Sequence, residues 1–297
     1  MGFESKNLSD ILENRSIINP LHEKMEKRKS FYQPNPEDFI GQNGYTKESV
    51  ESEIDRVEGY KKRWESDNTD ELKKQKKISD ILEGVIVDQF SGSWLSEKAE
   101  GHYTSEVDDV LRGVDVVAEL KENEDSHYLG FAIDVTMAKD PSVLDQKLAK
   151  NWKDIETGKF PEIKYFEDGD GNRQSLSPVR VLIAVNPNFA RELIRLEYLN
   201  KKELLAGHKF QSHLIFQIKE QLEAYYTYAK ETDNDNLMDK LRESLRILYI
   251  IISGEKEEHL AGMQNEVENE EDFKRIREYC NLKISGVAGR GSYGEAA

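Results

Sequence analysis

Residues 105–150 read SEVDDVLRGVDVVAELKENEDSHYLGFAIDVTMAKDPSVLDQKLAK and contain two runs of β-forming residues joined by a polar link. The runs cover residues 114–120 and 128–137. Each carries one aspartate, Asp115 or Asp134, at a position where a half-buried strand usually has an apolar residue. If the strands pair as a hairpin, the two carboxylates converge, and such like charges need a cation between them or a raised pKa. The sequence therefore predicts a divalent metal site here.

One face of the second run, residues 128–137, carries small side chains that leave space for a ligand beside a carboxylate. The two-residue period of a strand separates bulky from small side chains in this run. Asp134 falls on the face of small residues, and its neighbours there are Ala132, Thr136 and Ala138.

This arrangement resembles the PD-(D/E)XK nuclease superfamily over about residues 78–185. In that superfamily one strand carries an Asp, the next carries Asp or Glu, one residue and then Lys, and a preceding helix supplies a glutamate. Here Asp115 matches the first element, and Asp134 begins the second. Thr136 stands where the family's lysine is expected. Some members supply that lysine from the following helix, and Lys147 is the candidate here.

The resemblance implies an α/β (α+β) fold, with a restriction-endonuclease-like mixed β-sheet flanked by helices and with helical N- and C-terminal additions. A core helix is predicted over residues 76–90, with an apolar stripe from Ile78 to Ile86 and Glu83 at its edge. In the family comparison Glu83 is the helix-borne glutamate. A solvated helix glutamate is the alternative interpretation.

Acidic residues are also concentrated just before the first strand. Residues 102–109, HYTSEVDD, are predicted to form a loop, and Glu106 and Asp109 are candidate additional metal ligands. An ordinary solvated charge run is the alternative. We expect His102 to be a surface or capping residue rather than a ligand, because no second histidine lies at metal-binding spacing.

A helix is predicted over residues 141–157, where Asp140-Pro141 is a start signal and the buried stripe runs from Leu144 to Ile155. Lys147 lies about 100° from Leu148 at the edge of that stripe. This position suits a catalytic ammonium, and it equally suits a lysine whose stem is buried and whose charge is solvated.

The amino-acid composition restricts the kinds of partner that we expect for this protein. The net charge is −16, from 42 Lys and Arg against 58 Asp and Glu, which argues against a protein that coats nucleic acid through overall positive charge. A nuclease that binds nucleic acid in a local basic groove is still compatible with this net charge. The single cysteine, Cys280, predicts a reducing, cytoplasmic setting, and the longest apolar run, residues 247–252, is too short to span a membrane.

The domain organisation follows from these patterns. We expect a charged helical N-terminal extension over residues 1–76, a nuclease-like core over 77–206, a helical C-terminal region over 207–284 and a flexible tail over 285–297. Either helical region is a candidate surface for a protein partner or for homo-oligomerisation. The basic group Lys24, Lys27, Arg28 and Lys29 is predicted to be a solvated face, with a DNA-engaging arm as the alternative.

The remaining elements are two strands, at residues 162–167 and 179–185, and three C-terminal helices, at residues 189–205, 213–231 and 237–253. The strand at 179–185 is almost entirely apolar and is predicted to be central. Residues 168–172, DGDGN, lack the later positions of a calcium loop and are predicted to form a hairpin turn.

The function expected from the sequence is metal-dependent phosphodiester hydrolysis, with DNA a better candidate substrate than RNA. Mg²⁺ or Mn²⁺ is the expected cofactor because all candidate ligands are oxygens. The catalytic candidates are Asp115, Asp134, Lys147 and Glu83. Two alternatives are a degenerate nuclease-fold module that binds without cleaving, which Thr136 favours, and a glycosidase with an acid pair, for which no aromatic-lined cleft is evident.

Overall fold

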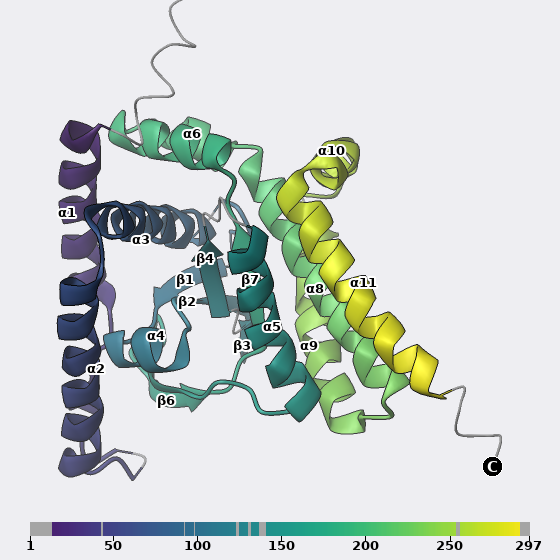
Figure 1. Ribbon diagram of the computed structural model, residues 1–297, viewed down its shortest axis with the longest axis horizontal. Helices are drawn as coiled ribbons and strands as arrows, with labels where there is room; N and C mark the ends of the chain where they lie inside the picture. The colour runs from purple at the N-terminus through teal and green to yellow at the C-terminus, as the bar shows by residue number, and fades with distance from the viewer. Residues whose placement is uncertain are drawn as a thin grey trace, which may run out of the picture.

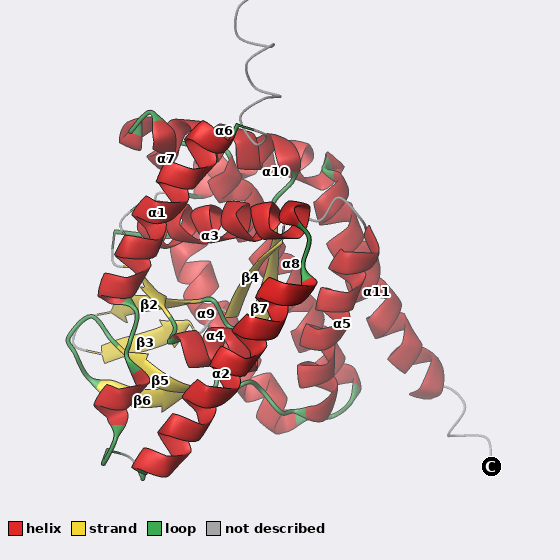
Figure 2. Ribbon diagram, turned by 60° about the vertical axis from the view of Figure 1, so that its left-hand side comes forward, coloured by secondary structure: helices red, strands yellow, loops and turns green. Residues whose placement is uncertain are grey.

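The computed structural model describes residues 14–42, 44–91, 93–97, 99–122, 125–129, 132–136, 141–253 and 256–291. The protein is mostly helical, with short strands between N-terminal helices on one side and C-terminal helices on the other (Figures 1 and 2). The described helices are α1 (Arg15–Tyr32), η1 (Pro36–Phe39, a 3-10 turn), α2 (Lys47–Asp67), α3 (Asp70–Phe90), α4 (Glu106–Arg112), α5 (Pro141–Thr157), α6 (Pro187–Tyr198), α7 (Lys202–Ala206), α8 (Phe210–Glu231), α9 (Asp235–Ile252), α10 (Glu257–Asn269) and α11 (Glu271–Gly291). The described strands are β1 (Ala99–Tyr103), β2 (Val116–Glu122), β3 (Asp125–Leu129), β4 (Ala132–Thr136), β5 (Ile163–Glu167), β6 (Arg173–Leu176) and β7 (Arg180–Ala184).

The strands form three small sheets rather than the single mixed central sheet that the sequence predicts. Among the described residues, β1, β2 and β3 form an antiparallel meander, β4 pairs in parallel with β7, and β5 pairs with β6 as a hairpin. The predicted run 128–137 is divided between β3 and β4, and residues 130, 131 and 137 lie outside the described residues. The first run therefore forms β2, which pairs with β3 at the start of the second run, whereas Asp134 lies in β4, which belongs to a different small sheet.

Strand β7 lies at the end of its sheet, so the prediction that it is central was wrong. Its burial on both faces is as expected, because every residue of β7 is buried. The edge opposite β4 is closed by two glutamines of α8. Gln217 accepts from the Ala184 amide at 2.7 Å and donates to its carbonyl at 3.0 Å, and Gln221 does the same to Leu182 at 2.9 and 2.7 Å. The side-chain amides thus replace a neighbouring strand and protect the edge.

Helix α3 is central to the main core and holds the candidate glutamate. Its buried apolar side chains pack against α1, where the stripe Ile18, Leu21 and Met25 is buried, and against β1. The approach to β1 requires glycine at position 101, because a Cβ there would lie 2.7 Å from the Val87 carbonyl oxygen. Residue 76, the predicted end of the N-terminal extension, lies inside α3.

Some of the other local predictions are confirmed and some were wrong. Helix α5 has the predicted bounds, and the hairpin turn between β5 and β6 is confirmed, with Asp168 accepting from the amides of Asp170 and Asn172. The predicted loop at 102–109 was wrong, because it contains the end of β1 and most of α4. The flexible tail was wrong in part, since α11 continues to Gly291 and residues 292–297 lie outside the described residues.

Two further observations concern the C-terminal helices and the membrane. Cys280 is buried within α11, as expected for a small residue in a C-terminal helix. Over the described part of the chain, we find no helix with the length and apolar character needed to cross a bilayer.

Candidate functional site

A cleft of about 1240 Å³ opens between α1, α2, α3 and α4. Its described lining holds six Lys or Arg and six Asp or Glu side chains, which makes it less acidic than the chain as a whole. Tyr60 and Trp64, one turn apart on α2, also line it, and 44 % and 38 % of their surfaces are exposed. The cleft therefore combines charged and aromatic side chains of the kinds that contact nucleic acid.

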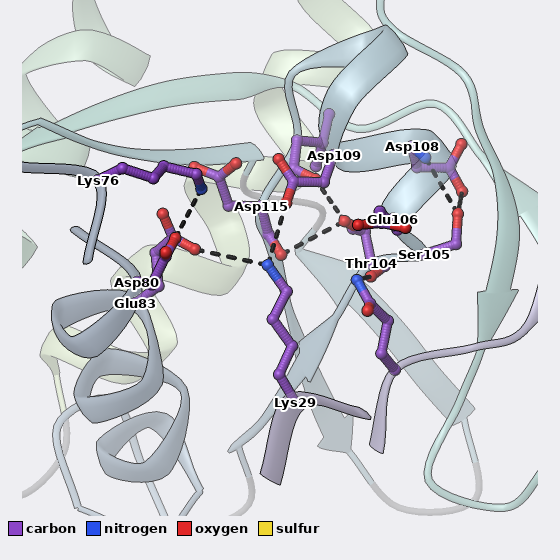
Figure 3. Close-up of polar contacts among 12 residues, drawn as sticks. Lys29, Lys76, Asp80, Glu83, Thr104, Ser105, Glu106, Asp108, Asp109 and Asp115 are labelled. Carbon is purple, nitrogen blue, oxygen red and sulfur yellow. Dashed lines mark hydrogen bonds and ion pairs between the residues drawn. The ribbon is translucent and has the colours of Figure 1, made fainter. Parts of the chain in front are cut away.

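At one wall of this cleft, three carboxyl groups from different elements gather around one lysine. Glu83 comes from α3, Asp109 from α4 and Asp115 from the residue preceding β2 (Figure 3). The Lys29 ammonium, from α1, lies 3.0 Å from Asp109 Oδ2 and 3.7 Å from Glu83 Oε2. We call Glu83, Asp109, Asp115 and Lys29 the carboxylate cluster.

A second lysine and a fourth carboxylate extend this group along α3. Lys76 Nζ donates to Asp80 Oδ1 at 2.6 Å, and His22 Nε2 lies 3.1 Å from Asp80 Oδ2. Lys76 also acts at longer range, since its charge is felt by Glu83 and Asp109. The two lysines partly neutralise the carboxylates.

Local sequence explains how Asp109 and Asp115 reach the same place. The Ser105 hydroxyl caps α4 by accepting from the Asp108 amide, and Gly113 ends the helix with a φ of 68°, which an L-residue with a side chain rarely adopts. The chain then turns into β2. The Thr104 amide donates to the Asp115 carbonyl at 3.2 Å and fixes the turn against the end of β1.

Burial and neighbouring charges together raise the pKa of some members of the cluster and lower that of another. Burial raises the pKa of Glu83 to about 7, although Lys29 and Lys76 oppose the shift. Burial also tends to raise the pKa of Asp109, but Lys29, Lys76 and a hydrogen bond shared with the Asp115 carboxyl bring it below its ordinary value. Burial alone would lower the pKa of Lys29, yet Asp109, Glu83 and Asp115 hold it well above its ordinary value. Near neutral pH, Glu83 can thus hold or release a proton while Lys29 stays charged.

The other predicted residues lie elsewhere. Glu106 is at the rim of the cleft, where its side chain is 50 % exposed and pairs with Lys61 at 2.6 Å. The Asp134 backbone pairs with Leu182 in the β4–β7 ladder, and its side chain lies outside the described residues. Lys147 is half-buried on α5, and the described contacts do not connect it with the carboxylate cluster.

Sequence reasoning missed Lys29 as a candidate site residue, and the prediction of a solvated basic face on α1 was wrong for this lysine, because only 16 % of its side chain is exposed. Lys24, Lys27 and Arg28 are exposed as predicted, although Lys24 pairs with Glu197 at 2.5 Å and Arg28 pairs with Asp88. A signal was present in the sequence, because Lys29 continues the buried stripe Ile18, Leu21, Met25 at helical spacing. The many charged residues of this segment led to the prediction of a solvated face in spite of that spacing.

Comparison with known proteins adds nothing to this geometry. The chain matches no family model, no curated protein and no solved structure.

The donor set itself is compatible with a hard divalent cation. Glu83, Asp109 and Asp115 offer only oxygen ligands, as Mg²⁺ and Mn²⁺ prefer. Glu83 is almost fully buried, and burial raises the pKa of its carboxyl although Lys29 and Lys76 oppose the shift. A cation bound beside it would supply further positive charge.

Proposed function

We propose that this protein is a metal-dependent nuclease that hydrolyses phosphodiester bonds, in DNA more readily than in RNA. The observation that carries the proposal is that Glu83, Asp109 and Asp115 act on one ammonium, that of Lys29, beside a cleft that Asp109 and Lys29 line together with other lysines and aromatic side chains. Glu83 comes from α3, Asp109 from α4 and Asp115 from the residue that precedes β2.

The order of elements supports a restriction-endonuclease-like core as the framework. The helix that carries Glu83 precedes β1, β2, β3 and β4, and helix α5 and the β5–β6 hairpin follow before β7, the parallel partner of β4. Antiparallel and parallel pairs both occur, but in separate small sheets. Asp134 lies within β4, and Asp115 lies one residue before β2.

In this proposal Asp115, with Glu83 or Asp109, holds Mg²⁺ or Mn²⁺, and Asp134 is the further ligand that the resemblance implies. The metal supplies an activated water and charge neutralisation on the phosphoryl oxygens. Glu83 holds a proton near neutral pH and passes it to or from the reacting oxygens. Tyr60 and Trp64 stack on bases along α2, and lysines at the rim contact phosphates.

The ammonium that Thr136 displaces needs a replacement, and two lysines compete for the role. The sequence nominates Lys147 on α5. The geometry favours Lys29, whose Nζ already faces Asp109 and Glu83. Because its carboxylate neighbours raise its pKa well above the ordinary value, Lys29 remains protonated and serves to stabilise negative charge, not to accept a proton.

The direct test is cleavage of plasmid DNA, linear DNA and RNA by the full chain in Mg²⁺ and in Mn²⁺. Wild type should cut DNA, and Asp115→Asn should reduce the rate by about 100-fold or more. Glu106→Gln is the matched control, because it removes a nearby acid that lies outside the carboxylate cluster. Equal rates for wild type and Asp115→Asn would exclude this site.

One observation favours a second candidate, a degenerate nuclease-fold module that binds without cleaving. Lys29 neutralises Asp109 and Glu83 without any metal, as a permanent structural ion pair would. This candidate predicts that wild type binds nucleic acid or a protein, cleaves neither DNA nor RNA in any metal, and retains its binding after Asp115→Asn.

A further inference from the structure

A second group of possible metal ligands lies on the β1–β2 ladder. Glu100 and Glu119 are directly opposite each other in this ladder, and His102 lies two residues from Glu100 on the same face. One imidazole nitrogen and one oxygen from each carboxylate all lie within 4.8 Å of one another. His102 Nε2 is 2.8 Å from Glu119 and 3.9 Å from Glu100.

Among the residues whose side chains the structure describes, the β5–β6 hairpin covers one side of this group. The Glu119 side chain has no exposed surface, whereas 44 % of the Glu100 side chain is exposed. The β5–β6 hairpin covers the inner side, where the Phe166 ring meets the His102 ring edge-on at 5.5 Å and the Gly169 amide donates to Glu119 at 3.4 Å. Solvent can reach the group past Glu100.

Two carboxylates face each other in this group. Like charges directly opposite each other in an antiparallel pair destabilise it, and a fully buried carboxylate carries a large desolvation cost. A divalent cation bound between them would bring two positive charges and would draw on the same three ligand atoms.

We propose that Glu100, His102 and Glu119 bind a divalent transition metal, Zn²⁺ or Mn²⁺, with water completing the coordination on the open side. One imidazole and two carboxylates form a ligand set that these ions accept. Glu119 is four residues beyond Asp115, about 13 Å along the strand, whereas paired catalytic metals lie about 4 Å apart. The site is therefore separate from the carboxylate cluster and links β1 to β2.

The test is calorimetric titration of the full chain with Zn²⁺ and with Mn²⁺. Asp115→Asn should retain the site, while His102→Gln and Glu100→Gln should each weaken it by about tenfold or more. Glu100→Gln changes a half-exposed side chain and should leave the fold intact. The matched control is His22→Gln, which disrupts the other His–carboxylate group found among the described residues, His22, Glu26 and Asp80, and should bind like wild type.

Two spectroscopic readouts accompany the titration. Co²⁺ bound in place of Zn²⁺ should give visible absorption that His102→Gln abolishes. Zn²⁺ should raise the Tm of Asp115→Asn but not that of the double variant with His102→Gln, since only a bound ligand stabilises the folded state. The proposal is overturned if wild type binds neither metal, if His102→Gln binds like wild type, or if His22→Gln removes the site. Because Asp115→Asn is measured in parallel, failure of the nuclease proposal leaves these outcomes unchanged.

Discussion

Asp108 and Asp109 are adjacent in α4 and have opposite surroundings. Asp108 has no exposed surface, and its carboxylate accepts from the amides of Lys164 and Tyr165 at 2.9 and 3.0 Å and from the Ser105 hydroxyl at 2.7 Å. Asp109 faces the cleft, and its partners are the Lys29 ammonium and the Asp115 carboxyl. One aspartate completes the backbone hydrogen bonding of β5, and the other belongs to a group of titratable side chains.

The difference teaches that the kind of partner separates a structural acid from a candidate functional one. Burial raises the pKa of Asp108, and Arg112 and the backbone donors only partly oppose the shift. The pKa of Asp109 is lowered, against the effect of burial, chiefly by the charges of Lys29 and Lys76, whose contacts a metal or phosphate can replace. Asp109 is therefore expected to matter for ligand binding, and Asp108 for stability.

The largest effect should come from removing the structural member of this pair. Asp108→Ala leaves two amides of β5 without their acceptor and removes one of the two carboxylates that pair with Arg112, so the free energy of unfolding should fall by on the order of 3–5 kcal/mol. Urea unfolding monitored by circular dichroism measures this. Asp109→Ala is the control and should lose less, because Lys29 keeps Glu83 as a partner. Equal losses would mean that both aspartates are structural.

The next effect concerns the lysine on the cleft side. Lys29→Ala should reduce the rate of DNA cleavage by about 100-fold, or about 2.7 kcal/mol in activation free energy, because Lys76, the other lysine near the cluster, acts on it only at longer range. Lys147→Ala should reduce the rate of DNA cleavage only slightly. Cleavage rates are compared at saturating metal, after unfolding curves confirm that each variant is folded.

Lys29→Arg sharpens this comparison, since a positive charge at position 29 should restore part of the activity. The opposite ranking, with Lys147→Ala inactive and Lys29→Ala active, would return the catalytic role to the lysine that the sequence nominates.

The sequence predicted the elements with strong periodicity and missed the contacts that depend on distant segments. The bounds of α5 followed from its start signal and its apolar stripe. Glu83 and Asp115 were nominated, and the structure places both in the carboxylate cluster, although their roles stay predictions. Lys29 was missed because its partners are 54 to 86 residues away, and in the sequence alone its acidic neighbours resembled a solvated surface.

The errors in the fold have a similar origin. The apolar sequence of β7 indicates burial on both faces, but it does not indicate whether a strand or a helix covers the edge of the strand. Gln217 and Gln221 of α8, more than thirty residues later in the sequence, form the hydrogen bonds at that edge. The short helix α4 was taken for a loop because its sequence is dominated by acids, whereas Ser105 and Gly113 are the cap signals that could have revealed it.

A smaller effect is expected from pH, through Glu83. Its folded pKa of about 7 lies above its ordinary value of 4.5, so the folded state binds the extra proton and loses stability as pH rises between these values. Relative to Glu83→Gln, wild type should therefore become less stable by on the order of 1–3 kcal/mol from about pH 5 to about pH 8 without metal. Urea unfolding of both proteins across this range tests it. A parallel pH dependence of the two would assign the titration to other groups.

The smallest effect should come from Glu106, which the sequence nominated as a ligand and the structure places at the rim. Its side chain is half exposed and paired with Lys61, and exposed ion pairs contribute about 0–1 kcal/mol. Glu106→Gln should thus leave the free energy of unfolding within that range. Affinity for Mn²⁺ should be nearly unchanged, whereas Asp109→Asn should weaken Mn²⁺ binding by about tenfold. Calorimetric titration of both variants decides the point. If Glu106→Gln weakens Mn²⁺ binding as much as Asp109→Asn does, both outward-facing acids of α4 reach the metal, and the ligand set extends to the rim of the cleft.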